Sequence, residues 1–232
     1  MIKAPTTYVA WDLETSGLKP EESEILEIGC VRVENGEIAE RKSWLLNHGI
    51  EISDTTVELT GITKEMIDEE GVDPQEAFAE FMEILTPGVP HLTHNGIRFD
   101  IPFLAHHLCR KFGKTRGDHR ELTDWLNRYA IDTAVIIKGE KLGMEWQWGE
   151  TFKEYADRVM NIIAKGVKYN VGICCEELDV DTEGLVQHRA LADVELTHRI
   201  YQAIQHPILK SDGPITLRPQ DFIPGGTITI PS

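Results

Sequence analysis

The chain has 232 residues, 41% of them hydrophobic, and this length predicts one domain with decorations around a single core. No stretch approaches the ~18 to 20 uninterrupted apolar residues of a membrane helix, and the N-terminus lacks the layout of a signal peptide. We therefore expect a cytoplasmic protein that does not contact a membrane. The net charge of −16 argues against a protein that coats nucleic acid, but leaves open an enzyme whose positive charge arrives as bound metal.

The stretch YVAWDLETSG, residues 8–17, has the alternation of an extended strand. Side chains two positions apart on a strand point to one face, so Tyr8, Ala10, Asp12 and Glu14 are expected on the same side. The two carboxylates then lie side by side, and adjacent like charges are costly to bury without a cation between them. No Lys or Arg stands between this pair and Lys19, so a divalent metal ion is the natural candidate. The alternative is an ordinary solvated pair at a strand end.

Two more strands are predicted in the next stretch, SEILEIGCVRVENGEIAERKSWLLN. Asn35-Gly36 between β-rich runs is a strong hairpin pattern, so residues 1–47 are expected to form a three-stranded antiparallel sheet. Glu27 could bring a further carboxylate close to the first strand, but we expect it to face solvent.

Three helix starts can be recognised from their capping residues. Thr63 can cap a short helix, and Asp73, which precedes a proline, begins a helix whose apolar residues predict packing on the core. Thr151 and Glu154 fit a capping box, and the apolar stripe of that helix is expected to continue to Ile163.

Residues 91–108, HLTHNGIRFDIPFLAHHL, combine a short strand with a helix. The strand is expected to end at Thr93, and Asp100 is expected to cap the helix. Asn95 and Phe99 lie between strand and helix, where a loop can meet a ligand. The alternatives are that Asp100 is only a cap and that Phe99 belongs to the core.

The third polar stretch is QHRALADVELTHRIYQAI, residues 187–204. Its apolar residues recur at helical spacing, and Asp193 lies beside that apolar face close to the start of the helix. His188 precedes the helix by a short distance and can approach the same cavity from the loop. An isolated histidine in such a place is otherwise most often structural.

The three stretches together resemble the DEDDh family of 3′-to-5′ exonucleases, which includes the proofreading epsilon subunit of bacterial DNA polymerase III, ribonuclease T and oligoribonuclease. The matching motifs are Asp12-Leu13-Glu14-Thr15, His94-Asn95 through Phe99-Asp100, and His188-Arg189-Ala190-Leu191-Ala192-Asp193. Leu59-Thr60-Gly61-Ile62-Thr63 also resembles a stretch of these enzymes. The tyrosine branch of the superfamily would have Tyr where this chain has Arg189. The resemblance covers roughly residues 6–204, and the order of the motifs makes it specific.

The resemblance implies a ribonuclease H-like α/β fold, in which a central mixed sheet has helices on both faces and the site lies at one sheet edge. It implies a metal-dependent 3′-to-5′ exonuclease that releases nucleoside monophosphates from single-stranded or frayed DNA ends. We place this exonuclease domain at residues 1–205, with an insertion at about 139–168. Residues 206–232 form a C-terminal extension that could dock a polymerase or another protein partner.

The resemblance also implies a role for each site residue. Two divalent ions, Mg²⁺ or Mn²⁺, would be held by four carboxylates, with one bridging both ions: Asp12 as the bridge, with Glu14, Asp100 and Asp193. His188 would take the proton from the attacking water as a general base. The terminal nucleotide would contact Thr15, Leu18, Asn95 and Phe99.

Two alternatives to a DNA exonuclease stay open at this point. The first is a short-RNA exoribonuclease of the same family, because no residue that we can identify encodes a requirement for the 2′-hydroxyl. The partner is in either case a nucleic acid with a free 3′ end, with DNA favoured. The second alternative is a binding module that has kept an exonuclease fold without turnover.

Overall fold

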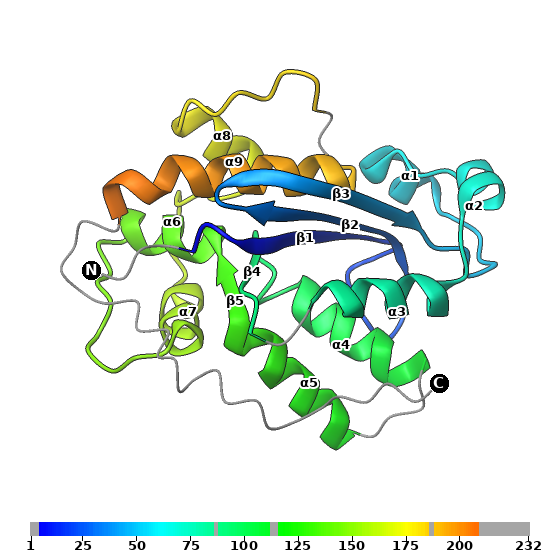
Figure 1. Ribbon diagram of the computed structural model, residues 1–232, viewed down its shortest axis with the longest axis horizontal. Coiled ribbons are helices and arrows are strands. Elements are labelled where there is room, and N and C mark those ends of the chain that lie inside the picture. Colours follow the sequence, from blue (N-terminus) through cyan, green and yellow to red (C-terminus); the bar gives the residue numbers. More distant parts are fainter. Residues whose placement is uncertain (1–4, 86–87, 112–115, 186–187, 209–232) are drawn as a thin grey trace.

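The computed structural model describes residues 5–85, 88–111, 116–185 and 188–208. This part of the chain forms a five-stranded sheet with the order β3-β2-β1-β4-β5. The strands are β1 (Tyr8–Thr15), β2 (Ile25–Glu34), β3 (Glu37–Leu45), β4 (His91–Thr93) and β5 (Ala130–Asp132). β1, β2 and β3 pair antiparallel, whereas β4 is parallel to both β1 and β5. The sheet is therefore mixed, and the predicted antiparallel unit of three strands is confirmed (Figure 1).

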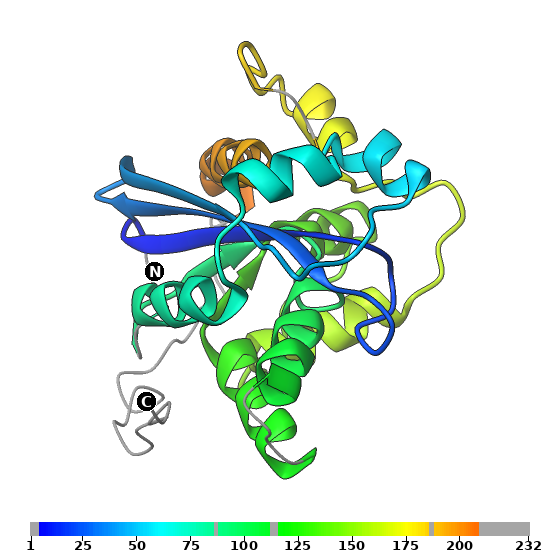
Figure 2. The same ribbon diagram turned by 90° about the vertical axis from the view of Figure 1, so that its right-hand side faces the viewer.

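Helices cover both faces of this sheet, as expected. Figure 2 shows the sheet nearly edge-on, with α9 on one side and α3, α4 and α5 on the other. The alternation along β1 explains the two layers, because Tyr8 and Ala10 pack with residues of α9 while Val9 and Trp11 pack with residues of α3 and α4. The helices are α1 (Asp54–Thr60), α2 (Lys64–Glu70), α3 (Pro74–Ile84), α4 (Asp100–Lys111), α5 (Arg116–Tyr129), α6 (Thr133–Lys141), α7 (Phe152–Asn161), α8 (Val171–Glu177) and α9 (Ala190–Ile208).

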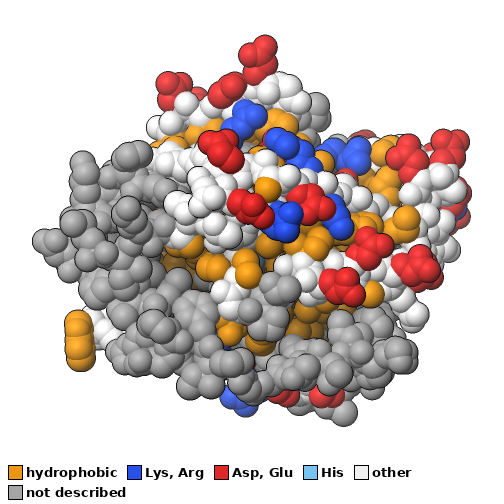
Figure 3. All heavy atoms as spheres, in the orientation of Figure 1, with side chains coloured by type: hydrophobic (Ala, Val, Ile, Leu, Met, Phe, Trp, Pro, Cys, Tyr) orange, Lys and Arg blue, Asp and Glu red, His pale blue; other side chains and the backbone are white. Residues whose placement is uncertain are grey.

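The hairpin between β2 and β3 turns at the predicted dipeptide. Asn35 and Gly36 have φ values of 53° and 88°, the left-handed conformations that a two-residue hairpin turn requires. β3 is an outer strand, and charged pairs such as Arg32–Glu40 and Arg41–Glu195 lie across it. Figure 3 shows Lys and Arg side chains interspersed with Asp and Glu side chains on the side of the molecule that faces the viewer in Figure 1. Such charges disfavour the addition of a further strand at an exposed edge.

The capping predictions are confirmed, but the end of one helix is not where we expected it. The side chains of Thr63 and Asp73 accept backbone N–H bonds at the starts of α2 and α3, and the capping box of α7 is complete. However, α7 ends at Asn161, and Ile163 is fully exposed rather than part of an apolar stripe. The carbonyl of Met160 accepts a bond from Lys138 Nζ (3.2 Å), so a tertiary contact satisfies the last turn.

No helix among the described residues is long and apolar enough to cross a bilayer.

Candidate active site

The parallel strands bring the three polar stretches to one end of the sheet. β1, β4 and β5 run in the same direction, so the segments that follow Thr15, Thr93 and Asp132 leave the sheet at the same end. Ligand sites of mixed α/β sheets commonly lie beyond the carboxyl ends of such strands. Because β1 is the central strand, the predicted site at a sheet edge lies at strand ends and not along an outer strand.

Three predicted carboxylates converge there from distant parts of the chain. Asp12 and Glu14 project from β1 and Asp193 from the first turn of α9, and each offers one oxygen within 4.8 Å of the others. All three side chains are half-buried. In the described part of the chain, this is the group that has the spacing of a metal site.

Asp100 adds a fourth carboxylate close to Asp12. It is buried and is the first residue of α4, so it is part of the helix and not the predicted cap before it. Its Oδ1 accepts a bond from the backbone N–H of Leu13 (3.3 Å), which ties α4 to β1 between Asp12 and Glu14. Among the neighbouring charges, Asp100 contributes most to raising the pKa of Asp12. The structure therefore brings the four predicted acids close together, and their role as metal ligands stays a prediction.

Burial raises the pKa of every acid in this cluster, and repulsion from other carboxylates adds to it. Burial, followed by repulsion from Asp100 and Glu14, raises the pKa of Asp12 well above its usual value. Burial and nearby carboxylates raise the pKa of Glu14 to about 8, and burial raises that of Asp100 to about 7. The pKa of Asp193 is also raised by burial. The cluster holds only oxygen donors and lacks a compensating charge of its own size, which is the environment that suits a hard divalent cation.

His188 lies beside the cluster on the loop that enters α9. Its backbone N–H donates to Asp193 Oδ2 (2.9 Å), and its charged form lowers the pKa of Asp193. The residue is exposed, and its φ of 68° is in the left-handed region that side chains other than glycine rarely adopt. The role of His188 as a general base stays a prediction.

Of the four predicted nucleotide contacts, Thr15 is the last residue of β1, and the other three lie on the loops that follow β1 and β4. Thr15 Oγ1 donates to the carbonyl of Gly17 (2.7 Å), and Leu18 has an exposed fraction of 82%. Asn95 has a φ of 65°, and Phe99 is half-buried against the core with its ring 5.3 Å from that of Phe103. Contact of these side chains with a nucleotide stays a prediction.

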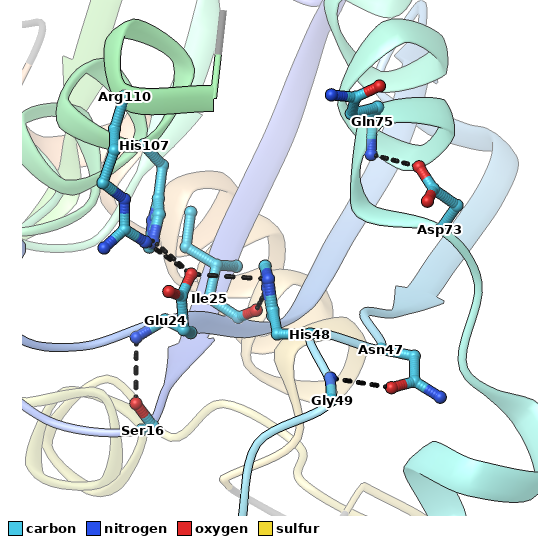
Figure 4. A network of polar contacts seen from close by, with 10 residues as sticks. All are labelled: Ser16, Glu24, Ile25, Asn47, His48, Gly49, Asp73, Gln75, His107 and Arg110. Carbon is cyan, nitrogen blue, oxygen red and sulfur yellow. Dashed lines mark hydrogen bonds and ion pairs between the residues drawn. The ribbon is translucent and has the colours of Figure 1, made fainter.

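A polar network fixes the loop that carries Leu18. Glu24 and Ser16 exchange two hydrogen bonds, Ser16 N to the Glu24 carbonyl and Glu24 N to Ser16 Oγ, both 2.9 Å. The Glu24 carboxylate in turn contacts His48, His107 and Arg110 at 3.4, 3.0 and 2.5 Å (Figure 4). The loop after β1 is therefore anchored to α4 and to the segment after β3.

Asp132 supports the site but was not among the predicted residues. It is buried, and its two carboxylate oxygens accept bonds from the backbone N–H groups of Asn95 (2.8 Å) and Ile97 (3.1 Å). The same side chain caps α6 through Ala134 and Val135. An Asp between a strand and a helix start can be read from the sequence as a cap, but its bonds to the loop after β4 cannot.

The expectation that Glu27 faces solvent is wrong. Only 1% of this residue is exposed, and its carboxylate accepts hydrogen bonds from Arg189, Ser43 and the backbone of Ala190. A buried carboxylate is tolerated when it is paired with a cation and hydrogen-bonded, and Arg189 supplies the cation from 162 positions away.

Comparison with known proteins finds one family over most of the chain. The model of the exonuclease family RNase T matches residues 9–201. The DNA polymerase III PolC-type of Thermotoga petrophila is 34% identical over 132 residues, which cover 57% of this chain and 9% of the polymerase. The 3′-5′ exonuclease DinG of Bacillus subtilis is 37% identical over 102 residues, 44% of this chain and 11% of DinG. The chain thus spans about a tenth of the length of these relatives.

Solved structures show the same fold at low sequence identity. E. coli exonuclease I in complex with a dA16 oligonucleotide superposes with a TM-score of 0.66 and 16% identity, over 94% of this chain and 42% of that one. This likeness confirms the expected ribonuclease H-like arrangement of a mixed sheet between helices.

Proposed function

The chain belongs to the exonuclease family, and on this premise we propose that it is a metal-dependent 3′-to-5′ exonuclease of the DEDDh type. Its substrate is a single-stranded or frayed DNA end, from which it releases nucleoside monophosphates. The observation that carries this proposal is the convergence of Asp12, Glu14 and Asp193 within 4.8 Å, with Asp100 beside Asp12. DNA is favoured as the substrate because the similar proteins include a DNA polymerase and an exonuclease bound to a DNA oligonucleotide.

The proposed cofactors are two Mg²⁺ ions, with Mn²⁺ as a substitute. When bound, such ions stabilise the charge that develops on the attacking and leaving oxygens of an in-line displacement at phosphorus. Carboxylate oxygens are ligands that suit hard cations such as Mg²⁺ and Mn²⁺. Asp12 is proposed to bridge the two ions, Glu14 and Asp193 to hold one of them, and Asp100 to hold the other.

The other site residues act on protons and on the position of the substrate. His188 accepts the proton of the attacking water, because it lies next to Asp193 and is exposed to solvent. Thr15 at the end of β1 and Leu18 on the anchored loop after it receive the terminal nucleotide. Asn95 and Phe99 line its pocket from the loop after β4. The acidic cluster repels the phosphodiester backbone until the metal ions neutralise it, so substrate binding depends on metal.

The experiment that tests this function measures nucleotide release from matched oligonucleotides. Wild-type protein with Mg²⁺ is expected to shorten a 5′-labelled single-stranded DNA from its 3′ end. Asp12→Ala is expected to abolish this release, because it removes the bridging carboxylate. Asp157→Ala removes an exposed acid that pairs with Lys153 on the same helix; it is the control and is expected to keep full activity.

The same assay separates the alternative functions. Faster release from an RNA oligonucleotide of the same sequence would replace the DNA assignment with a short-RNA exoribonuclease. If the wild type binds neither Mg²⁺ nor Mn²⁺ in a calorimetric titration, the binding module without turnover would be the better description. Activity that survives in Asp12→Ala would remove this residue from the proposed ligand set.

The domain limits, the partner and the location remain predictions. The exonuclease domain at residues 1–205 includes the insertion at about 139–168, which contains α7. The extension at 206–232 is proposed to dock a polymerase or another protein, but residues 209–232 lie outside the described part of the chain. A cytoplasmic location can be tested by cell fractionation.

A further inference from the structure

Glu27 is a buried acid with a full set of donors, and the chemistry proposed above does not use it. Arg189 donates from both Nε and Nη2 at 3.0 Å, Ser43 Oγ donates at 2.7 Å and Ala190 N donates at 3.1 Å. Two parallel bonds from one guanidinium fix the relative orientation of the two side chains as well as their distance. The carboxylate of Glu27 therefore holds both the side chain of Arg189 and the first backbone N–H of α9.

The backbone of α9 meets β2 at the same point without a side chain between them. A Cβ added to Gly29 would lie 2.5 Å from the backbone carbon of Ala190 and from the nitrogen of Leu191. Glycine is thus required where the helix start contacts the strand. Gly29 lies two positions from Glu27 on β2, so both residues face α9. The first turn of α9 is therefore held on β2 by the backbone contact at Gly29 and by the Glu27–Arg189 ion pair.

Arg189 lies inside the turn that carries the general base. His188 precedes it with a φ of 68°, and the N–H of His188 donates to Asp193 Oδ2 at 2.9 Å. The N–H of Asp193 donates to the carbonyl of Arg189 at 3.0 Å. These two bonds hold the turn from His188 to Asp193 together, and the guanidinium of Arg189 links this turn to Glu27 on the sheet.

We propose that Glu27 and Arg189 are positioning residues, which hold His188 and Asp193 at a fixed place relative to Asp12 and Glu14 on β1. The inference rests on the proposed function, since it explains how that site is aligned. Asp12 and Glu14 need no such device because the strand itself spaces them. His188 and Asp193 belong instead to the start of α9 and the loop before it. The Glu27–Arg189 pair is a polar contact that fixes the position of this segment on β2, the strand that pairs with β1.

The test compares two ion pairs that join the same helix to the same sheet. Glu27→Gln and Arg189→Lys weaken the pair at the start of α9, and the control Arg41→Ala removes the bond from β3 to Glu195 two residues after Asp193. With Mg²⁺ and single-stranded DNA, kcat is expected to fall about 10- to 100-fold in Glu27→Gln, with KM changed little, as for residues that support metal ligands. Arg189→Ala should lose as much, and Arg189→Lys should recover part of the loss. Arg41→Ala should stay within about twofold of wild type.

A second readout does not depend on turnover. Backbone amide exchange of His188 and Ala190, measured without metal, is expected to be faster in Glu27→Gln and Arg189→Ala than in Arg41→Ala. The reason is that the carboxylates that accept these two N–H bonds, on Asp193 and Glu27, are no longer held by the Glu27–Arg189 pair. Unchanged kcat in the Glu27 and Arg189 variants, or exchange no faster than in the control, would overturn the proposal. If Glu27→Gln does not fold, Arg189→Ala and Arg189→Lys decide by the same criteria. The Arg189 side chain is partly exposed, so its substitution disturbs the core less. If the wild type lacks nuclease activity, the proposed function fails while the exchange experiment still decides the positioning role.

Discussion

His188 and the acids around it illustrate how one residue can serve two needs. Its backbone supports Asp193 through a hydrogen bond, while the proposed function assigns proton transfer to its imidazole. Substitution of the side chain therefore separates the two roles, since the backbone N–H is retained in any variant except proline. The left-handed φ of 68° is one that alanine adopts at a modest cost.

The first prediction at this scale concerns the side chain of His188. His188→Ala is expected to slow nucleotide release by about 100-fold or more while leaving the calorimetric affinity for Mn²⁺ nearly unchanged, as loss of a general base does. His119→Ala, a change at a half-buried histidine on α5, is the matched control and should keep wild-type turnover. Equal rates for the wild type and His188→Ala at neutral pH would exclude the role of general base.

At the scale of elements, short strands and the loops after them build the site. β4 and β5 have three residues each, yet the loop after β4 must present Asn95 and Phe99. Asp132, at the end of β5, joins two N–H groups of that loop to the start of α6. Satisfied backbone donors keep such a loop in one conformation, which a binding site requires.

A substitution at Asp132 tests whether this residue holds the loop after β4 in place. Asp132→Asn is expected to lower the free energy of unfolding by about 1 to 3 kcal/mol, because an amide nitrogen would face buried donors that need an acceptor. Asp73→Asn changes an exposed cap at the start of α3 and should cost almost nothing, because Asn caps helices about as well as Asp. Urea unfolding of both variants checks the difference, and equal costs would show that Asp132 is no more than a cap.

At the scale of the whole molecule, the net charge of −16 and the raised pKa values of the site both make the folded protein less stable as its acids lose protons. A folded protein that keeps acids protonated above their usual pKa binds more protons than its unfolded chain. Its stability from these groups is present at low pH and is lost as the pH rises through the folded pKa values. Divalent ions that bind the deprotonated acids remove this loss.

The pH dependence of stability follows with a defined sign. Buried His91, whose pKa is lowered to about 4, adds stability as the pH rises to about 6.5, so the acids are best observed above that value. With EDTA, the melting temperature is expected to fall between pH 6.5 and 8, as Asp100 (about 7) and Glu14 (about 8) lose protons. Mg²⁺ should reduce this fall, and Glu14→Gln should lessen it without metal. A melting temperature that is flat over this range in EDTA would contradict the assignment.

Much of this protein is determined by patterns that a few neighbouring residues carry. The alternation of Asp12 and Glu14, the turn at Asn35-Gly36 and the capping residues of α2, α3 and α7 all depend on backbone geometry over short spans. The family resemblance that the acidic motifs carry predicted the mixed sheet with helices on both faces. The same motifs predicted the carboxylate cluster, in which the structure places Asp12, Glu14 and Asp193 together.

Tertiary structure alone decided the residues that hold these pieces in place. Glu27 looks like a surface acid from its neighbours, yet it is buried because Arg189 reaches it from 162 positions away. Asp132 reads as a cap, yet it also fixes a loop 37 positions earlier in the chain, and α7 ends where Lys138 binds its last turn. The physical reason is the same in each case: a polar group can be buried wherever partners satisfy it, and those partners become neighbours only when the chain has folded.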